Sequence, residues 1–385
     1  MISTKLKPFG TTIFAEMTAL AQQHNALNLS QGFPDFDGPS DIIDAAVKAM
    51  RSGKNQYARS MGHPKLVTAI ADKQRDIYDL IYDPLCEVTV FSGATEGIAS
   101  SMLGLLNPGD EVILFEPFYD SYPACCALSG TIPRYCALRF PDFSFDESQL
   151  ASLFNTKTRM LVLNSPHNPT GKVFSGNELN VIADLCRRHD VFVLTDEVYE
   201  HLIFDGLEQI PIARLPGMWE RTLRLSSTGK TYSYTGWKIG WGTGPARLVA
   251  AAQAAHQFVT FATATPLQCA MAEAIRRHST NYFKSFQAEY TDRRDLLVQG
   301  LTAAGFNVAI PRGTYFVLAG FEKLWQGDDR SFVRYLIETH KVAAIPPSVF
   351  YKDHVGEGQR LVRFAFCKKL ETLEETVRRL KGLCR

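Results

Sequence analysis

Two lysines lie eight residues apart in a stretch that is rich in hydroxyl groups and glycine. The stretch begins Ser226-Ser227-Thr228-Gly229-Lys230 and continues to Gly236-Trp237-Lys238. An ordinary lysine has a pKa of about 10.4, but burial or a nearby positive charge lowers it toward ~7–8, where the amine becomes a nucleophile and a base. Lys238 or a phosphate-bound cationic cluster would exert that influence, and the hydroxyls would help to hold a phosphate. The pattern favours amine chemistry beside an anion site, although a single surface lysine would need no such explanation.

Carboxylate and amide groups form two further clusters. Thr195-Asp196-Glu197-Val198-Tyr199 follows an apolar run, and Asp196 needs a cationic partner there because a buried, unpaired carboxylate is costly. A helix N-cap is the alternative role for Asp196. Asn168 lies in the proline-rich loop 164–171, where turn chemistry alone would also explain an asparagine.

Two more segments offer a phosphate cradle and an aromatic face. Gly93, Ala94 and Thr95 are predicted to open a helix, and the free N–H groups of a helix N-terminus suit a phosphate, although a plain helix start explains the same residues. Tyr119 follows another apolar run and would present its ring to a planar ligand. Core packing is the alternative for this tyrosine.

Each of these segments follows a short apolar run, and the runs alternate with helical patterns. Such runs are typical of strands that are buried on both faces, so the centre of the chain is predicted to be an α/β fold with a mostly parallel sheet sandwiched by helices. Ligands bind beyond the carboxyl ends of the strands in such sheets, so we expect the polar segments to meet there. The runs are residues 88–91, 111–115, 160–163, 191–194 and 222–225.

The two ends of the chain have a different character. From about Tyr282 a long helical pattern precedes three short strand patterns and a charged helix from Leu370, which predicts a smaller α+β domain. The first forty residues, rich in Gly, Pro and Asp, are expected to form an irregular arm. We therefore predict an N-terminal arm over 1–38 at the mouth of the site, a large cofactor-binding domain over 39–282 and a small domain over 283–385.

Composition excludes several classes of protein. The 385 residues carry a formal charge of +1, which gives no overall attraction to nucleic acid or anionic lipid. The eight cysteines are scattered and form no C-x-x-C pair, which indicates reduced thiols. The sequence shows no signal peptide and no apolar run long enough to cross a bilayer. We expect a cytoplasmic protein that binds neither nucleic acid nor membrane. The nine histidines are dispersed, so no metal site is predicted.

The combined motifs resemble the fold-type I pyridoxal-phosphate aminotransferases (class I/II) of the aspartate aminotransferase superfamily. The resemblance covers essentially the whole chain and rests on residues 164–171, 196–199, 227–240 and 362–364. Within the family, Gln31-Gly32-Phe33-Pro34-Asp35-Phe36, Asn55-Gln56-Tyr57 and His256-Gln257 are similar to the methionine aminotransferases and the kynurenine aminotransferase/glutamine transaminase enzymes.

The resemblance implies pyridoxal 5'-phosphate as cofactor and a role for each motif residue. Lys230 would bond to the cofactor and act as the base, Asp196 would pair with the ring nitrogen, and Asn168 and Tyr199 would bond the ring's phenolate oxygen. Arg363, with Asn168 and the Gly32 backbone, would bind the substrate carboxylate. Tyr119 would stack on the ring, and the phosphate would contact Gly93, Ala94, Thr95, Ser227 and Lys238. The lysine at 238 departs from the arginine of many aspartate enzymes but matches the methionine and kynurenine branch.

The resemblance also implies a homodimer with shared active sites, because Tyr57 and Phe261 match positions that reach the partner's site. Phe14, Tyr57, Phe261, Tyr315 and Phe350 would select the substrate side chain. We therefore expect ping-pong transamination between a 2-oxo acid and an amino acid such as methionine, phenylalanine, tyrosine, leucine, histidine or kynurenine.

The sequence also bears on three other activities. A β-lyase acting on cysteine S-conjugates would use the same cofactor and break a different bond. A nucleotide-binding loop at Gly229-Lys230-Thr231 lacks its required glycine, because residue 224 is arginine. A hydrolase would need a G-x-S-x-G elbow, which the sequence does not contain.

Overall fold

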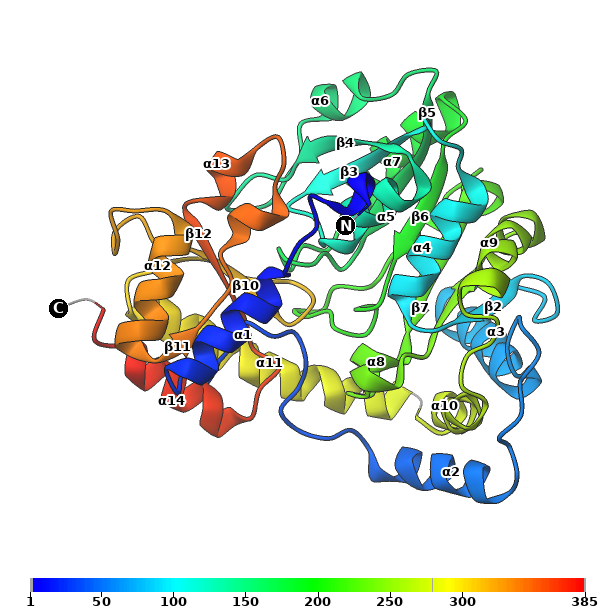
Figure 1. Cartoon of the computed structure of the whole chain (residues 1–385), viewed down its shortest axis with the longest axis horizontal. Helices are drawn as coiled ribbons and strands as arrows, with labels where there is room; N and C mark the ends of the chain where they lie inside the picture. The colour runs from blue at the N-terminus through cyan, green and yellow to red at the C-terminus, as the bar shows by residue number, and fades with distance from the viewer. Residues whose placement is uncertain (1–2, 279, 384–385) are drawn as a thin grey trace.

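A seven-stranded sheet forms the centre of the molecule (Figure 1). The computed structural model describes residues 3–278 and 280–383. The strand order is β2-β8-β7-β6-β5-β3-β4, and all strands run in one direction except β8, which is antiparallel to both neighbours. The strands are β2 (Val88–Phe91), β3 (Glu111–Glu116), β4 (Ile132–Ala137), β5 (Thr158–Asn164), β6 (Phe192–Asp196), β7 (Thr222–Ser227) and β8 (Gly240–Thr243).

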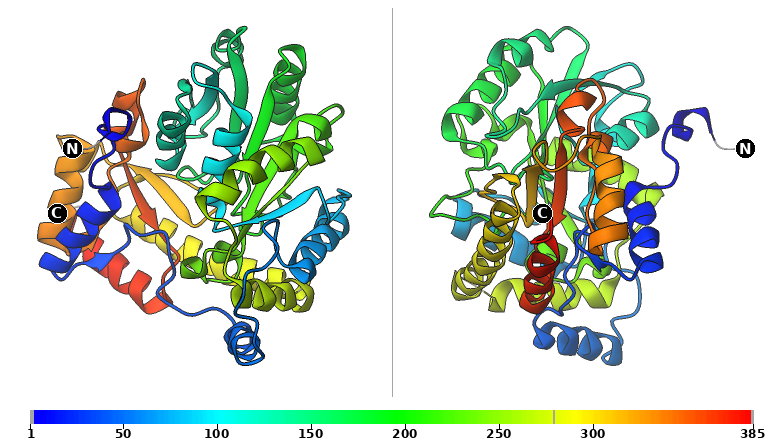
Figure 2. Two further views of the ribbon diagram at one scale, coloured as in Figure 1. Left: turned by 45° about the vertical axis from the view of Figure 1, so that its right-hand side comes forward. Right: turned by 90° about the vertical axis from the view of Figure 1, so that its left-hand side faces the viewer.

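Helices cover both faces of this sheet (Figure 2). Neighbouring residues of β3 enter different cores: Leu114 packs in the core that contains residues of α4, α5 and α9, whereas Ile113 packs in the core that contains residues of α6 and α7. Burial on both faces explains why these strands are continuous apolar runs. The helices are α4 (Ala94–Leu105), α5 (Ser121–Ser129), α6 (Glu147–Ser152), α7 (Gly176–Arg188) and α9 (Ala246–Val259).

A third group of helices packs beside the β2 edge of the sheet, where α10 contacts α2 and α3. The helices of this group are α2 (Ser40–Arg51), α3 (Pro64–Tyr78) and α10 (Thr265–Arg277).

Short helical turns connect β6 to β7 and β7 to β8, and one of them carries Lys230. The turns are η2 (Ile212–Arg214), η3 (Trp219–Arg221), α8 (Thr228–Thr231) and η4 (Thr235–Trp237).

The C-terminal residues build a second, smaller body together with the N-terminal ones (Figure 1). Its antiparallel sheet has the order β12-β10-β9, and β1 pairs in parallel with β11. Ile13, Met17 and Ala21 of α1 are buried in its core. Its segments are η1 (Thr4–Leu6), α1 (Ile13–Gln23), β1 (Leu27–Asn28), α11 (Thr280–Ala303), β9 (Asn307–Ala309), β10 (Phe316–Gly320), α12 (Asp329–Tyr335), the π-helix η5 (Leu336–His340), β11 (Val342–Ala343), η6 (Pro347–Phe350), α13 (Val355–Gly358), β12 (Leu361–Ala365) and α14 (Leu370–Leu380).

The α/β class and the mostly parallel sheet confirm the prediction from sequence. The expectation of an irregular N-terminal arm was wrong for residues 13–23, which form a helix that begins where the Thr12 side chain accepts a hydrogen bond from the Ala15 N–H. The division of the chain at residues 38 and 282 stays a prediction.

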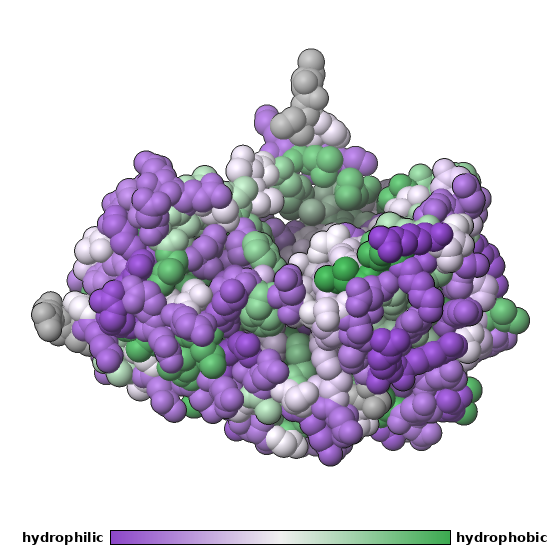
Figure 3. All heavy atoms as spheres, turned by 90° about the horizontal axis from the view of Figure 1, so that it is seen from below, coloured by the Kyte–Doolittle hydropathy of each residue, from purple (hydrophilic) through white to green (hydrophobic). Residues whose placement is uncertain are grey.

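The surface is mixed in character. Figure 3 shows a largely hydrophilic face with apolar atoms in separate patches and a hollow beneath the N-terminal segment. Within residues 3–278 and 280–383, each helix is too short or too polar to span a membrane.

Candidate active site

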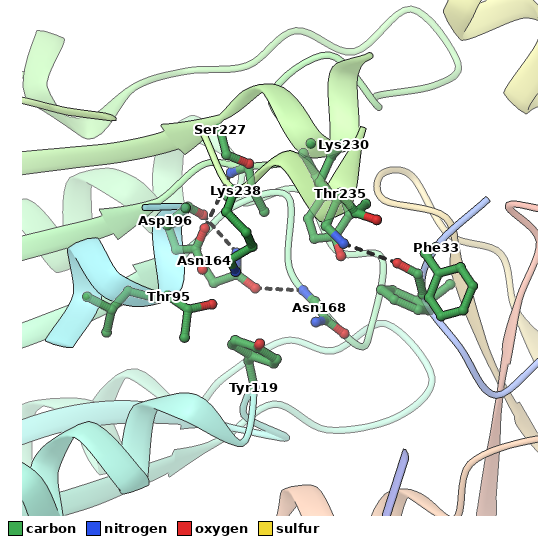
Figure 4. A pocket seen from close by; sticks show the side chains of 18 of the residues that line it. Phe33, Thr95, Tyr119, Asn164, Asn168, Asp196, Ser227, Lys230, Thr235 and Lys238 are labelled. Atoms are coloured by element: carbon green, nitrogen blue, oxygen red, sulfur yellow. Dashed lines mark hydrogen bonds between the residues drawn. The ribbon is translucent and has the colours of Figure 1, made fainter. Parts of the chain in front are cut away.

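A cavity of about 280 Å³ lies at the carboxyl ends of the parallel strands, between the two bodies (Figure 4). Strands β2, β3, β5, β6 and β7 all point the same way, so the residues that follow them meet at one edge of the sheet. The N-terminal segment and the small body supply the remaining wall. The expected site residues that line this cavity are Phe14, Gly32, Gly93, Ala94, Thr95, Tyr119, Asn168, Asp196, Tyr199, Ser227, Lys230, Lys238 and Arg363.

Two of the expected site residues lie elsewhere. Tyr57 is 80% exposed and Phe261 is 48% exposed, and their rings contact each other edge to face with centroids 5.0 Å apart. Within a single chain they therefore contact solvent and each other. Their expected place in a partner's site stays a prediction.

Lys230 projects from the short helix α8 into the cavity. Its Nζ donates a hydrogen bond to the Gly32 carbonyl over 3.1 Å. Burial lowers the pKa of Lys230 to about 8, and the positive charges of Lys238 and Arg363 act in the same direction. The amine is thus partly neutral near physiological pH, as nucleophilic and basic chemistry require.

Asp196 ends strand β6 and is buried beneath the cavity. Its carboxylate accepts hydrogen bonds from the Tyr122 hydroxyl over 2.8 Å and from the Val198 N–H over 3.3 Å. Burial raises its pKa to about 6, against the lowering influence of these two bonds. Among the residues that the structure describes, no lysine or arginine forms an ion pair with it, which leaves it suited to a cationic group of a ligand.

The N-terminus of α4 forms a cradle on the opposite side of the cavity. Gly93 caps this helix with φ of 80°, and no side chain caps the helix at this end. A Cβ atom at Gly93 would lie only 2.9 Å from Cε and Nζ of Lys238. Unpaired helix N–H groups beside an ammonium group and the Ser227 hydroxyl form a favourable place for a phosphate.

Arg363 is buried in strand β12, with 1% of its surface exposed. Its Nη2 donates to the Ser30 carbonyl over 2.9 Å, its Nη1 donates to Oδ1 of Asn168 over 3.3 Å, and its Nε has no hydrogen-bond partner among residues 3–278 and 280–383. Burial lowers its pKa to about 10. A buried guanidinium with an unused donor is suited to an incoming carboxylate.

Aromatic rings surround this guanidinium. The ring of Phe316 lies 4.2 Å from the guanidinium carbon, Phe350 lies 5.2 Å away and Phe14 lies 5.3 Å away. Tyr315, which was expected to select the substrate side chain, is fully buried, and its hydroxyl donates to the Gly32 carbonyl. Tyr315 thus contacts the segment that holds Lys230.

Several polar residues of the site had no role in the sequence analysis. The Asn164 side chain accepts a hydrogen bond from the Asn168 N–H over 2.7 Å and donates one to the Asp196 carbonyl over 2.7 Å, so it ties two strand ends together (Figure 4). Tyr122 holds Asp196 from α5. Asn164 directly follows the apolar run 160–163, which was the available signal, whereas Tyr122 lies inside helix α5, and nothing in the sequence shows which neighbour each one bonds.

Comparisons with known proteins identify the family. Residues 24–380 match the family model of aminotransferases class I and II. The chain is 43% identical to the solved structure of N-succinyldiaminopimelate aminotransferase from Mycobacterium tuberculosis, over 100% of both chains and with a TM-score of 0.96. It is 40% identical to methionine aminotransferase of Escherichia coli K12, over 99% of this chain and 98% of that protein, and 38% identical to kynurenine–oxoglutarate transaminase of Dictyostelium discoideum, over 97% and 94%. The chain therefore belongs to the class I and II aminotransferases, a family of pyridoxal-phosphate-dependent enzymes.

Proposed function

We propose that this aminotransferase moves the amino group of an L-amino acid with an apolar or aromatic side chain to a 2-oxo acid, in a ping-pong cycle. The observation that carries the proposal is Arg363, a buried guanidinium without a carboxylate partner in the described part of the chain, at the wall of a cavity that Phe14, Phe33 and Phe316 also line. The expected donors are methionine, phenylalanine, tyrosine, leucine, histidine and kynurenine.

The unpaired groups of the cavity fit pyridoxal 5'-phosphate. Asp196 would hold the ring nitrogen, Tyr119 would face the ring, and Asn168 and Tyr199 would bond the phenolate oxygen. The backbone of residues 93–95 would hold the phosphate together with Ser227 and Lys238. When bound, the cofactor supplies an aldehyde that bonds reversibly to amines and a ring that withdraws electrons from the substrate α-carbon.

Lys230 would form the covalent bond to the cofactor and then move the proton of the substrate α-carbon. Its pKa of about 8 leaves a minor but useful fraction of Nζ neutral at pH 7, on the order of a tenth. In its neutral form Nζ would accept the proton from the substrate α-carbon, and as an ammonium group it would give that proton back to the reacting molecule. The Gly32 carbonyl, 3.1 Å from Nζ, keeps the amine inside the cavity.

Arg363 would bind the substrate carboxylate and so fix which α-carbon bond faces Lys230. The forked guanidinium suits two parallel hydrogen bonds to a carboxylate. Phe14, Phe316 and Phe350 pack against it and exclude water, which strengthens its attraction for an anion.

The charges of the cavity favour a neutral side chain over an acidic one. The only cationic residues among the lining residues of the described chain are Lys230, Lys238 and Arg363, and all three have roles in the proposal. N-succinyldiaminopimelate, the substrate in the name of one relative, is outside the substrates expected from the sequence. It carries further carboxylates, for which the residues that line the cavity offer no additional cation.

A half-reaction screen tests the substrate class. The purified enzyme, loaded with cofactor, is mixed with single amino acids, and the loss of absorbance of the lysine-bound cofactor is followed. Methionine and the aromatic amino acids are expected to react faster than aspartate, glutamate and N-succinyl-L,L-diaminopimelate. A faster reaction with any of these acidic substrates than with methionine would contradict the proposal.

We further propose that the active enzyme is a homodimer with shared sites. Tyr57, Phe258, Val259 and Phe261 form an exposed apolar group, hereafter the aromatic edge, in which Phe258 is 86% and Val259 54% exposed. Large exposed apolar groups of this kind mark interaction surfaces. A second copy would cover the aromatic edge and place Tyr57 and Phe261 at the partner's cavity.

A further inference from the structure

Glu116, the last residue of β3, is a fully buried carboxylate that the proposed reaction does not use. It accepts hydrogen bonds from the backbone N–H groups of Lys352, of Asp353 over 3.0 Å and of His354 over 3.2 Å. Nδ1 of His354 lies 2.8 Å from the same carboxylate. A strand of the large sheet is thereby fixed to a loop of the small body by donors that all belong to three consecutive residues.

Both chain segments that leave this contact enter the active site. Two residues after Glu116, the Phe118 N–H donates to the Phe350 carbonyl over 2.8 Å, and the next residue, Tyr119, lines the cavity. On the segment that leads into residues 352–354, the ring of Phe350 lies 5.2 Å from the guanidinium carbon of Arg363 and 6.1 Å from the ring of Phe14. Glu116 therefore connects the wall that carries Tyr119 to the wall that covers Arg363.

We propose that Glu116 is a positioning residue for substrate binding, which holds Phe350 over Arg363 and so keeps the carboxylate site closed to water. The inference rests on the proposed role of Arg363. Its effect is specific to the carboxylate side of the cavity, because the cradle at Gly93 and the end of β6 at Asp196 belong to other strands of the sheet. Among the proposed cofactor residues, Tyr119 alone lies on the segment that follows Glu116, so loss of the Glu116 contacts frees residues 350–354 and leaves Asp196, Lys230 and the phosphate cradle in place.

A nearby ion pair provides a matched control. Arg139 and Glu357 also join the large body to the residues just after the loop, with Nη1 and Oε1 2.5 Å apart. Their side chains are 50% and 33% exposed, and an exposed pair of this kind contributes little. Glu357→Gln therefore removes an ionic contact between the same two bodies without touching the buried carboxylate.

The test compares Glu116→Gln, His354→Ala and Glu357→Gln in the holoenzyme. Calorimetric titration with 3-phenylpropionate, a carboxylic acid without an amino group, measures the carboxylate site without turnover. Steady-state kinetics with methionine separates KM from kcat, and a fluorescence titration gives the cofactor affinity. In Glu116→Gln, the acid binds about tenfold more weakly and KM rises about tenfold, as expected for lost hydrogen bonds to a charged group, while kcat and cofactor affinity stay within about twofold.

His354→Ala and Glu357→Gln serve as a milder variant and as the matched control. His354→Ala removes one of the four donors and is expected to show the same pattern at about threefold, which keeps the test valid if Glu116→Gln does not fold. Glu357→Gln is expected to match the wild type. Unchanged acid binding in Glu116→Gln, or an equal loss in Glu357→Gln, overturns the inference alone. A wild-type holoenzyme that binds cofactor but no acid overturns the proposed role of Arg363 and this inference together.

Discussion

The residues around the cavity carry charges that this chain leaves incompletely paired. Asp196 is buried and Lys230 is partly buried, and removal from water shifts each pKa toward the neutral form, to about 8 for the amine and to about 6 for the carboxyl. Arg363 keeps an unused donor. Unpaired buried charges are destabilising in a protein by itself, and the cost is recovered when a complementary ligand binds. The site is therefore specialised for binding at the expense of stability.

The stability cost of Asp196 is directly measurable. Asp196→Asn removes a buried charge while keeping the size of the side chain, so the variant without cofactor should be more stable at pH 7 by about 1–3 kcal/mol, although it loses activity. Thermal or denaturant unfolding of the cofactor-free proteins measures this.

The gain should depend on pH in a defined direction. Because burial raises the pKa of Asp196 from 3.8 to about 6, its contribution to folding is fully favourable below pH 3.8 and is lost as the pH rises through about 6. The difference between variant and wild type should therefore shrink from pH 7 toward pH 4. An equal difference at both pH values would show that the carboxylate is not desolvated as described.

Arg363 is predicted to require its forked geometry as well as its charge. Arg363→Lys should raise KM for methionine about tenfold or more, because an ammonium group cannot make two parallel bonds, whereas cofactor affinity should be unchanged. Arg360→Lys is the matched control, since Arg360 forms an exposed pair with Glu322. Similar kinetics in both variants would remove Arg363 from the carboxylate site.

At the scale of elements, the start of α4 illustrates how one glycine shapes the cavity. Gly93 has φ of 80°, and an added Cβ would reach within 2.9 Å of Lys238. Gly93→Ala is therefore predicted to lower cofactor affinity at least about tenfold, because the cradle narrows and its N–H groups turn away. The affinity is measured by titrating the cofactor-free protein.

A substitution at a second glycine, Gly109, shows whether backbone strain alone lowers the cofactor affinity. Gly109 has φ of 91° with no atom within 4 Å of an added Cβ. Gly109→Ala should destabilise the fold by about 1–2 kcal/mol, as a left-handed residue with a side chain does, and leave cofactor affinity unchanged. Loss of affinity in both variants would assign the effect to strain alone.

The elements that the sequence predicted well are those with uniform burial. The central strands β3, β5, β6 and β7 are buried along almost their whole length, and the short runs within them were recognised as strands. The edge strand β4 contains Pro133 and Arg134 and is partly exposed, and β8 contains two glycines among four residues, so neither carries a strand pattern. Strands β4 and β8 form because they pair with neighbouring strands in the sheet, and sequence periodicity does not encode that pairing.

The same distinction applies to the site. Residues shortly after an apolar run, such as Asp196 and Lys230, line one cavity because strand direction brings them together. Nothing in the sequence indicated the role of Glu116, because its partners at 352–354 are more than 230 residues away. Contacts of this kind depend on how the small body packs on the sheet.

At the scale of the whole molecule, the aromatic edge is the feature that a single chain leaves unexplained. Tyr57 is 80% exposed although its ring is large and mostly apolar. In a dimer with shared sites, each cavity combines Lys230 of one subunit with Tyr57 of the other.

Mixing two damaged subunits tests this arrangement. Lys230→Ala and Tyr57→Ala are each predicted to be nearly inactive alone, whereas equal amounts that are unfolded and refolded together should regain roughly a quarter of wild-type activity. Random pairing makes half of the dimers mixed, and each mixed dimer has one intact site of its two, so a quarter of all sites are intact. No recovery in the mixture, with dimers present, would show that each site belongs to a single subunit.

The identity of the reactive amine is the central claim. The purified enzyme with bound pyridoxal phosphate is reduced with borohydride, digested and mapped by mass spectrometry. The reduced cofactor is expected on the peptide that contains Lys230, at that side chain, and Lys230→Ala is expected to abolish the label. A label on Lys238 or another lysine, or no label on a protein that binds the cofactor, would contradict it.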